Sequence, residues 1–99
     1  MDNVKSLVLQ RLKGLRREHI VMSEYAQRRA AFRQVDLEDV IDNLLNPIRL
    51  QWAERQLVDG EERHNCFFVY KRRALRCIVK FNGSNVKVIN VIKPKKWPV

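Results

Sequence analysis

Residues 65–92, NCFFVYKRRALRCIVKFNGSNVKVINVI, contain the clearest pattern of secondary structure in the chain. Short polar segments divide them into three apolar runs, at 65–70, 75–81 and 86–92. The Asn82-Gly83 pair is typical of a tight hairpin turn, whereas the Lys71-Arg72-Arg73 turn lacks glycine and leaves its register open. The last run is apolar on both faces, which indicates a central strand. This segment therefore predicts three consecutive strands joined by hairpins.

The first quarter of the chain has a helical pattern. Apolar residues at positions 4, 7, 8, 12 and 15 form one stripe, which predicts a helix within residues 1–17. The run from His19 to Met22 indicates a short strand, after which Ser23 has the side chain and position of an N-cap. The helix that follows is expected to bury its apolar residues, namely Tyr25, Ala26, Ala30 and Phe32.

A third helix is predicted between Asp36, which serves as its N-cap, and Pro47, which ends it. Residues 48–52 then alternate between apolar and polar, as in a half-buried strand. A polar loop is expected from about residue 54 to residue 64. The order of these elements predicts an α+β fold, with about three helices packed on a mainly antiparallel sheet of four to five strands.

The length of 99 residues indicates a single domain. It is expected to comprise four parts: an N-terminal helix (1–17), a strand and two helices (19–47), antiparallel strands (48–93) and a basic tail (94–99). Apolar residues make up 45% of the chain and charged residues 31%, as in globular proteins. No apolar run approaches the roughly 20 residues of a membrane span, and charges interrupt the N-terminus. We therefore expect an intracellular protein without a membrane partner.

The net charge of +9 is unevenly distributed along the chain. Residues 1–35 carry a balance of +5 and residues 36–62 a balance of −6, whereas residues 63–99 carry ten basic side chains and no acidic one. A face of one sign is the electrostatic footprint of a polyanion binder. The simpler interpretation is a basic protein whose charge serves solubility or thermal stability.

Alternation in the strand 75–81 places Arg76, Ile78 and Lys80 on one face, with no acidic residue in the same segment. Cations at this spacing beside aromatic side chains are suited to nucleic-acid backbones. The leading prediction is nucleic-acid binding through the sheet and tail. The candidate binding residues are Arg63, Lys71, Arg72, Arg73, Arg76, Lys80, Lys87, Lys93, Lys95 and Lys96.

Two other functions remain open at this point. In the first, a metal-independent ribonuclease, cations stabilise the charge on the phosphoryl oxygens and His64 or Tyr70 moves protons, with Arg76 as the third catalytic candidate. In the second, a non-enzymatic structural or partner-binding protein of a thermophile or its virus, an exposed Ile78 would mark a homodimer face. An acidic protein would be a partner of the basic surface.

The two cysteines, Cys66 and Cys77, fall on adjacent predicted strands, where two buried free thiols are favoured over a disulfide. His64 and Cys66 alone do not make a metal site. No glycine-rich phosphate loop or zinc-protease motif is present, so no cofactor or metal is predicted.

Residues 19–47, HIVMSEYAQRRAAFRQVDLEDVIDNLLNP, followed by hairpin strands, resemble an uncharacterised branch of the RelE/ParE-like toxin superfamily. The matching positions are Ser23, Ala26, Arg29, Asp39-Val40 and Pro47, and the resemblance covers about residues 19–93. It implies a small α+β fold with basic and proton-transferring residues on its sheet and, in some members, cleavage of messenger RNA on the ribosome. Tyr25 stands where this branch usually has histidine, so the role of that histidine is not carried over.

In size and composition alone, the chain is also similar to orphan proteins of filamentous viruses that infect hyperthermophilic archaea. That similarity implies no particular activity.

Overall fold

The computed structural model describes residues 3–93 and has an α+β fold. Its three helices and five strands confirm the predicted class. The helices are α1 (Asn3–Leu12), α2 (Glu24–Phe32) and α3 (Leu37–Leu45), and the strands are β1 (Ile20–Met22), β2 (Leu50–Val58), β3 (Glu61–Tyr70), β4 (Arg73–Asn82) and β5 (Asn85–Ile92). Two short 3-10 turns, Arg17–His19 and Pro47–Arg49, lead into β1 and β2.

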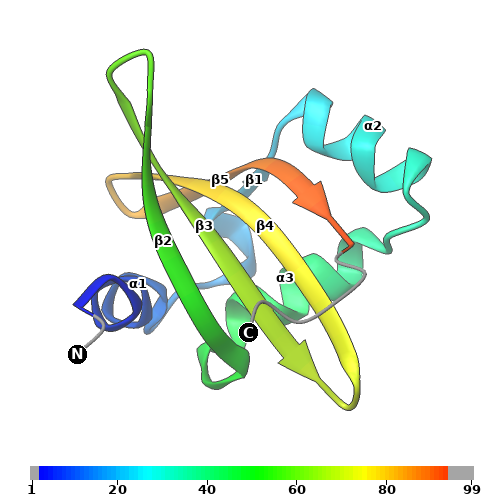
Figure 1. Cartoon of the computed structure of the whole chain (residues 1–99), viewed down its shortest axis with the longest axis horizontal. Helices are drawn as coiled ribbons and strands as arrows, with labels where there is room; N and C mark the ends of the chain where they lie inside the picture. The colour runs from blue at the N-terminus through cyan, green and yellow to red at the C-terminus, as the bar shows by residue number, and fades with distance from the viewer. Residues whose placement is uncertain (1–2, 94–99) are drawn as a thin grey trace.

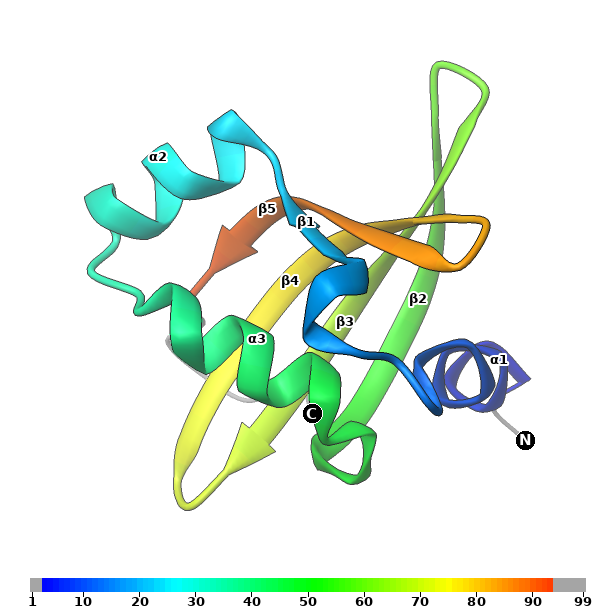
Figure 2. The same ribbon diagram turned by 180° about the vertical axis from the view of Figure 1, so that it is seen from behind.

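The strands form one sheet in the order β1-β5-β4-β3-β2. Neighbouring strands are antiparallel except for β1, which pairs in parallel with β5. Figure 1 views the sheet from the side opposite α3, and Figure 2 shows α3 in front of it. The strand predicted to be central, β5, lies between β1 and β4.

The hydrophobic core lies between one face of the sheet and the helices. Each helix contributes buried residues to it: Val8 and Leu12 from α1, Ala26 from α2, and Val40 and Leu44 from α3. The strands contribute every second residue to the core, including Cys66, Phe68, Leu75, Cys77 and Val79. Because strand side chains alternate, the residues between these point to the other face.

The predicted caps of α2 and α3 are confirmed. Ser23 Oγ accepts a hydrogen bond of 3.0 Å from the Ala26 amide, and Asp36 Oδ1 accepts one of 2.9 Å from the Glu38 amide. The predicted burial of the α2 aromatics is wrong, since Tyr25 is 47% and Phe32 79% exposed. Only Ala26 and Ala30 of α2 are buried, because this helix lies near the β1 edge of the sheet (Figure 1) and contacts the sheet mainly through β5.

Within residues 3–93, no helix has both the length and the apolar character needed to cross a bilayer.

Three two-residue turns connect the last four strands. Asp59 and Gly60 join β2 to β3, both with positive φ (52° and 80°), as in a type I′ turn. The expected polar loop of residues 54–64 is therefore wrong: β2 and β3 extend almost to their turn. Gly83 and Ser84 join β4 to β5, and only Gly83 has positive φ (62°), as in a type II′ turn.

The turn between β3 and β4 departs from this chemistry. Lys71 and Arg72 have φ values of 47° and 66°, so this is a type I′ turn without glycine, asparagine or aspartate. The left-handed conformation costs an ordinary L-residue roughly 1–2 kcal/mol. The flanking pair Tyr70 and Arg73 closes the hairpin, so the turn contains two residues rather than the three expected.

Replacing this turn by Lys71→Asn together with Arg72→Gly should stabilise the protein. Asparagine and glycine adopt positive φ more readily, so we expect the free energy of unfolding to rise by about 1–2 kcal/mol. Urea unfolding measures the change. As a control, Gly60→Ala should destabilise the protein, because its φ is 80° although no atom lies within 4 Å of the added carbon. A lower stability of the Lys71/Arg72 double variant would contradict this account of the turn.

Candidate nucleic-acid interface

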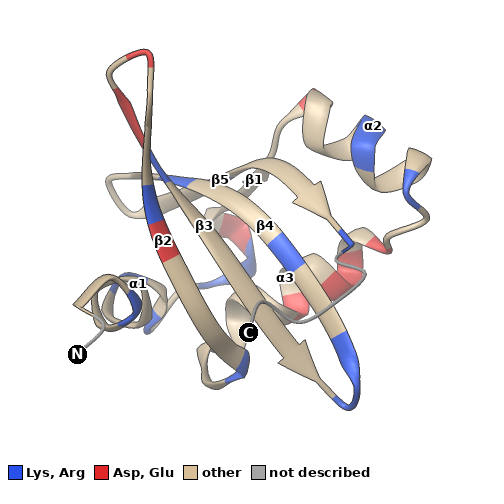
Figure 3. Cartoon of the chain, in the orientation of Figure 1, with Lys and Arg blue, Asp and Glu red and all other residues tan. Residues whose placement is uncertain are grey.

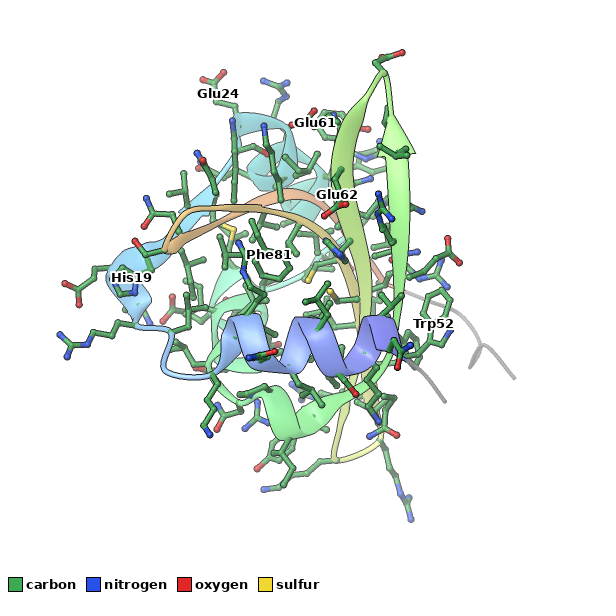
Figure 4. All side chains as sticks on the ribbon, turned by 90° about the vertical axis from the view of Figure 1, so that its left-hand side faces the viewer. His19, Glu24, Trp52, Glu61, Glu62 and Phe81 are labelled. Carbon is green, nitrogen blue, oxygen red and sulfur yellow. The ribbon has the colours of Figure 1, made fainter. Side chains whose placement is uncertain are left out.

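The alternation predicted for β4 is confirmed. Leu75, Cys77 and Val79 enter the core, and Arg76, like Lys80, points to the face opposite it. Across that face, Trp52, Phe67, Arg76 and Ile92 occupy neighbouring strands in register. The Arg76 guanidinium lies 5.8 Å from the Trp52 ring centre. Figure 4 shows Trp52 projecting from the outer side of the sheet, whereas Phe81 lies on the side of α1.

This outer face of the sheet is less exposed than the sequence suggested. Phe67 is fully buried, and Asn65 is only 6% exposed. Arg76 and Ile78 are half-buried, and Arg76 Nε is buried with no hydrogen-bond partner among residues 3–93. In the middle of the outer face, the cation available to a polyanion is therefore the partly buried guanidinium of Arg76, next to the indole ring of Trp52.

Acidic residues from earlier in the chain lie beside the basic strands. Glu61 contacts two of the candidate binding residues: its carboxylate lies 2.7 Å from Lys80 Nζ and 3.0 Å from Arg63 Nη2. Hydrogen bonds from Lys80 and then Arg63 lower the pKa of Glu61 below its usual value. The expectation that no acid lies near Lys80 is therefore wrong. Glu61 is the first residue of β3, and the antiparallel pairing of β3 with β4 places it beside Lys80.

The strongest concentration of unneutralised cations is at the opposite end of β3, around the β3–β4 turn (Figure 3). We call this the basic hairpin end; it comprises Arg49, Lys71, Arg72, Arg73 and Lys93. All five line one groove next to Tyr70. Asp36, Asp39 and Asp42 line the same groove, but among residues 3–93 only Arg73 of these cations has a carboxylate within 4 Å, since its Nη1 lies 3.8 Å from Asp39 Oδ2. Arg49 stacks on the Tyr70 ring, with the guanidinium carbon 3.7 Å from the ring centre.

The remaining basic candidates are more dispersed. Lys87 is exposed on β5, directly opposite Lys80. Lys95 and Lys96 lie outside the described residues. Arg49 was not among the predicted binding residues, because it precedes the basic segment of the sequence. Only the tertiary fold brings it next to the hairpin.

The three catalytic candidates do not share a site. His64 points to the helix-covered face and is 2% exposed, whereas Arg76 points to the outer face. Tyr70 is six residues beyond His64 on the same strand, about 20 Å away at the usual strand rise. His64 and Tyr70 therefore cannot act together on one phosphate.

His64 occupies a small hollow of about 310 Å³ between α1 and the sheet, lined also by Arg11, Glu62 and Lys80. Its ring centre lies 5.2 Å from that of Phe81, and both its nitrogens are buried without a hydrogen-bond partner in the described part of the chain. Burial lowers the pKa of His64 below its ordinary value of 6.5, and the nearby Glu62 carboxylate opposes this effect. The imidazole is therefore neutral at pH 7.

The cysteines face each other directly across β3 and β4 and are free and buried, as predicted. Burial raises the pKa of Cys66 to about 12, and burial followed by the neighbouring Cys66 raises that of Cys77. Neither thiol is therefore a nucleophile at neutral pH. Among residues 3–93, no three His, Cys, Asp or Glu side chains are grouped so as to hold a metal ion.

Comparisons of the chain with protein-family models, with curated proteins and with solved structures gave no match. The resemblance to the RelE/ParE-like superfamily therefore stays a prediction. The geometry of the basic hairpin end is the basis on which a function can be assigned.

Replacing His64 should change how stability depends on pH. In the unfolded chain His64 takes up a proton near pH 6.5, whereas in the folded protein its pKa is lower, so the wild type loses stability as pH falls below about 6.5. The His64→Leu variant lacks this loss, and at pH 7.5 it should be at least as stable as the wild type, because two unpaired buried nitrogens are removed. Urea unfolding at pH 7.5 and 5.5 measures both effects.

His19→Gln is the matched control and should keep the pH dependence of the wild type. An identical loss of stability between pH 7.5 and 5.5 in His64→Leu and the wild type would show that His64 is not the group responsible.

Proposed function

We propose that the protein binds single-stranded nucleic acid through the basic hairpin end. The observation that carries this proposal is the convergence of five cations on one groove, four of them without an acidic partner among the described residues. Phosphate groups are the commonest anions that such a cluster would neutralise, with release of counterions.

The backbone of the turn supports the same proposal. Lys71 and Arg72 adopt a left-handed backbone conformation that asparagine and glycine adopt more readily. The two cations at these positions therefore lower the stability of the fold. Strained residues that persist in a fold often have a function that a more relaxed residue would not provide. Here the turn projects two exposed cations from the end of a rigid hairpin.

The shape of this region favours a single strand over a duplex. Tyr70 is 43% exposed beside the turn, and Lys71 Nζ lies 5.2 Å from its ring centre. Aromatic rings next to cations stack unpaired bases while the cations contact the phosphates. The groove itself is concave and is entered more readily by an unstacked nucleotide than by a base pair.

Removing the two turn cations should weaken binding without weakening the fold. For Lys71→Asn together with Arg72→Gly, we expect a more stable turn but lower affinity for single-stranded RNA and DNA oligonucleotides. The slope of log affinity against log salt should become shallower by roughly 1.4, because each phosphate that is no longer neutralised lowers it by about 0.7. Fluorescence anisotropy between about 50 and 200 mM salt measures both quantities.

The matched control, Lys13→Gln together with Arg28→Gln, removes the same charge from exposed positions outside the groove. It should keep most of the affinity. Equal losses of affinity in the two double variants would indicate nonspecific attraction to net charge, and the absence of binding near physiological salt would refute the proposal.

The ribonuclease alternative has less support, because His64, Tyr70 and Arg76 are not brought together. It predicts cleavage of the same RNA oligonucleotides, sensitive to His64→Ala and Arg76→Ala. Binding without cleavage is expected.

A further inference from the structure

The groove beside the basic hairpin end has two chemically different walls and a volume of about 1120 Å³. Cations from the hairpin and from the end of β5 line one wall. Acceptor groups of α3 line the other, namely Asp39, Asp42 and Asn43. The volume is at or slightly above the roughly 300–1,000 Å³ typical of pockets that enclose small organic molecules. A ligand that fills it must therefore offer negative charge to one wall and hydrogen-bond donors to the other.

The side chain of Asn43 has an acceptor oxygen that lacks a hydrogen-bond donor. The side chain is 8% exposed and lines the groove. Its Nδ2 donates a 2.8 Å hydrogen bond to the Asp39 carbonyl oxygen, which fixes the amide so that Oδ1 is the free end. Oδ1 is buried and accepts no hydrogen bond from any of the residues that the structure describes. Buried carbonyl oxygens of this kind are normally paired, so a donor from outside the chain is expected here.

Asp39 lies one helical turn before Asn43, and residues at this spacing share a helix face. The two side chains therefore lie on the same face of α3, with two acceptor oxygens on the half-exposed Asp39 carboxylate and one on the buried Asn43 amide, which has to shift outward to meet a ligand. The carboxylate is half exposed and lies 3.8 Å from the Arg73 guanidinium of the hairpin. Adjacent N–H groups on one planar edge match these acceptors.

We propose that this groove binds one unstacked nucleotide and prefers guanine, whose N1–H and N2–H groups donate to Asp39 and Asn43 while its phosphate contacts the basic hairpin end. This inference rests on the proposed nucleic-acid binding and adds base selectivity to it. Of the common bases, guanine presents two adjacent kinds of N–H donor on its Watson–Crick edge. Uracil has one N–H between two carbonyl oxygens, and adenine and cytosine each place an acceptor nitrogen beside their amino group, so all three leave an acceptor facing the carboxylate.

An arginine side chain of a protein partner also carries paired N–H donors. Its positive charge would however lie among Arg49, Lys71 and Arg73, which line the same groove. A nucleotide brings the donors together with a negative charge, and so satisfies both walls at once.

The test compares two labelled RNAs of the same length, one entirely of uridine and one with a single central guanosine, by fluorescence anisotropy. The wild type should bind the guanosine-containing RNA about tenfold more tightly, the usual effect of one good bidentate base contact. Asp39→Asn replaces one acceptor by a donor at constant size, so this preference should fall to less than about threefold. Affinity for oligouridine should stay the same or increase, because a negative charge beside the cations is removed.

Glu38→Gln is the matched control. It removes the same charge from the neighbouring residue of the first turn of α3, where Glu38 pairs with Arg17 outside the groove. It should keep the guanosine preference of the wild type.

Each other outcome is decisive. Equal affinities of the wild type for the two RNAs would overturn base selectivity and leave nucleic-acid binding intact. A guanosine preference that survives in Asp39→Asn would exclude this groove as its source. If neither RNA binds near physiological salt, both the proposed function and the guanine preference fail.

Discussion

The register of the hairpins is the constraint on which the rest of the structure depends. Each of the last three connections contains two residues, so the strands that it joins are held in a fixed alignment. A slip of one residue between β3 and β4 would either exchange Phe68 for Phe67 in the core or turn Arg76 towards the helices. The separation of an apolar face from a face with cations therefore follows from turn geometry as much as from hydrophobicity.

Much of this architecture could be predicted from the sequence, because its determinants are local. The caps Ser23 and Asp36, the stripe of α3 and the alternation of β4 each involve only a few neighbouring residues. The predicted polar loop failed because residues 54–64 are charged rather than apolar, and their ion pairs, such as Arg55 with Glu62 at 2.7 Å, support a strand that extends beyond the core. Tyr25 and Phe32 were misjudged because burial of α2 depends on where the sheet ends.

The candidate site was predicted only in part, since charge segregated along the chain is not segregated in space. Residues 63–99 contain no acid, yet Glu61 neutralises Arg63 and Lys80, and the acids of α3 line the groove of the basic hairpin end. Arg49 joins that groove from outside the basic segment. Long-range placement of this kind has no signature in a single sequence, whereas the glycine-free turn at Lys71-Arg72 was visible as an anomaly.

The parallel pairing of β1 with β5 has a consequence for how the chain folds. Ile20 lies opposite Val86, so β1 cannot pair until β5, 66 positions further along the chain, has been synthesised. The hairpins of β2 to β5 are local and can form first, whereas closing β1 onto β5 spans most of the chain and carries a larger loop entropy. Ser23 Oγ donates a hydrogen bond of 3.2 Å to the Ile89 carbonyl oxygen, so α2 is anchored only in that last step. During translation, β1 and α2 would thus remain undocked until β5 has emerged from the ribosome.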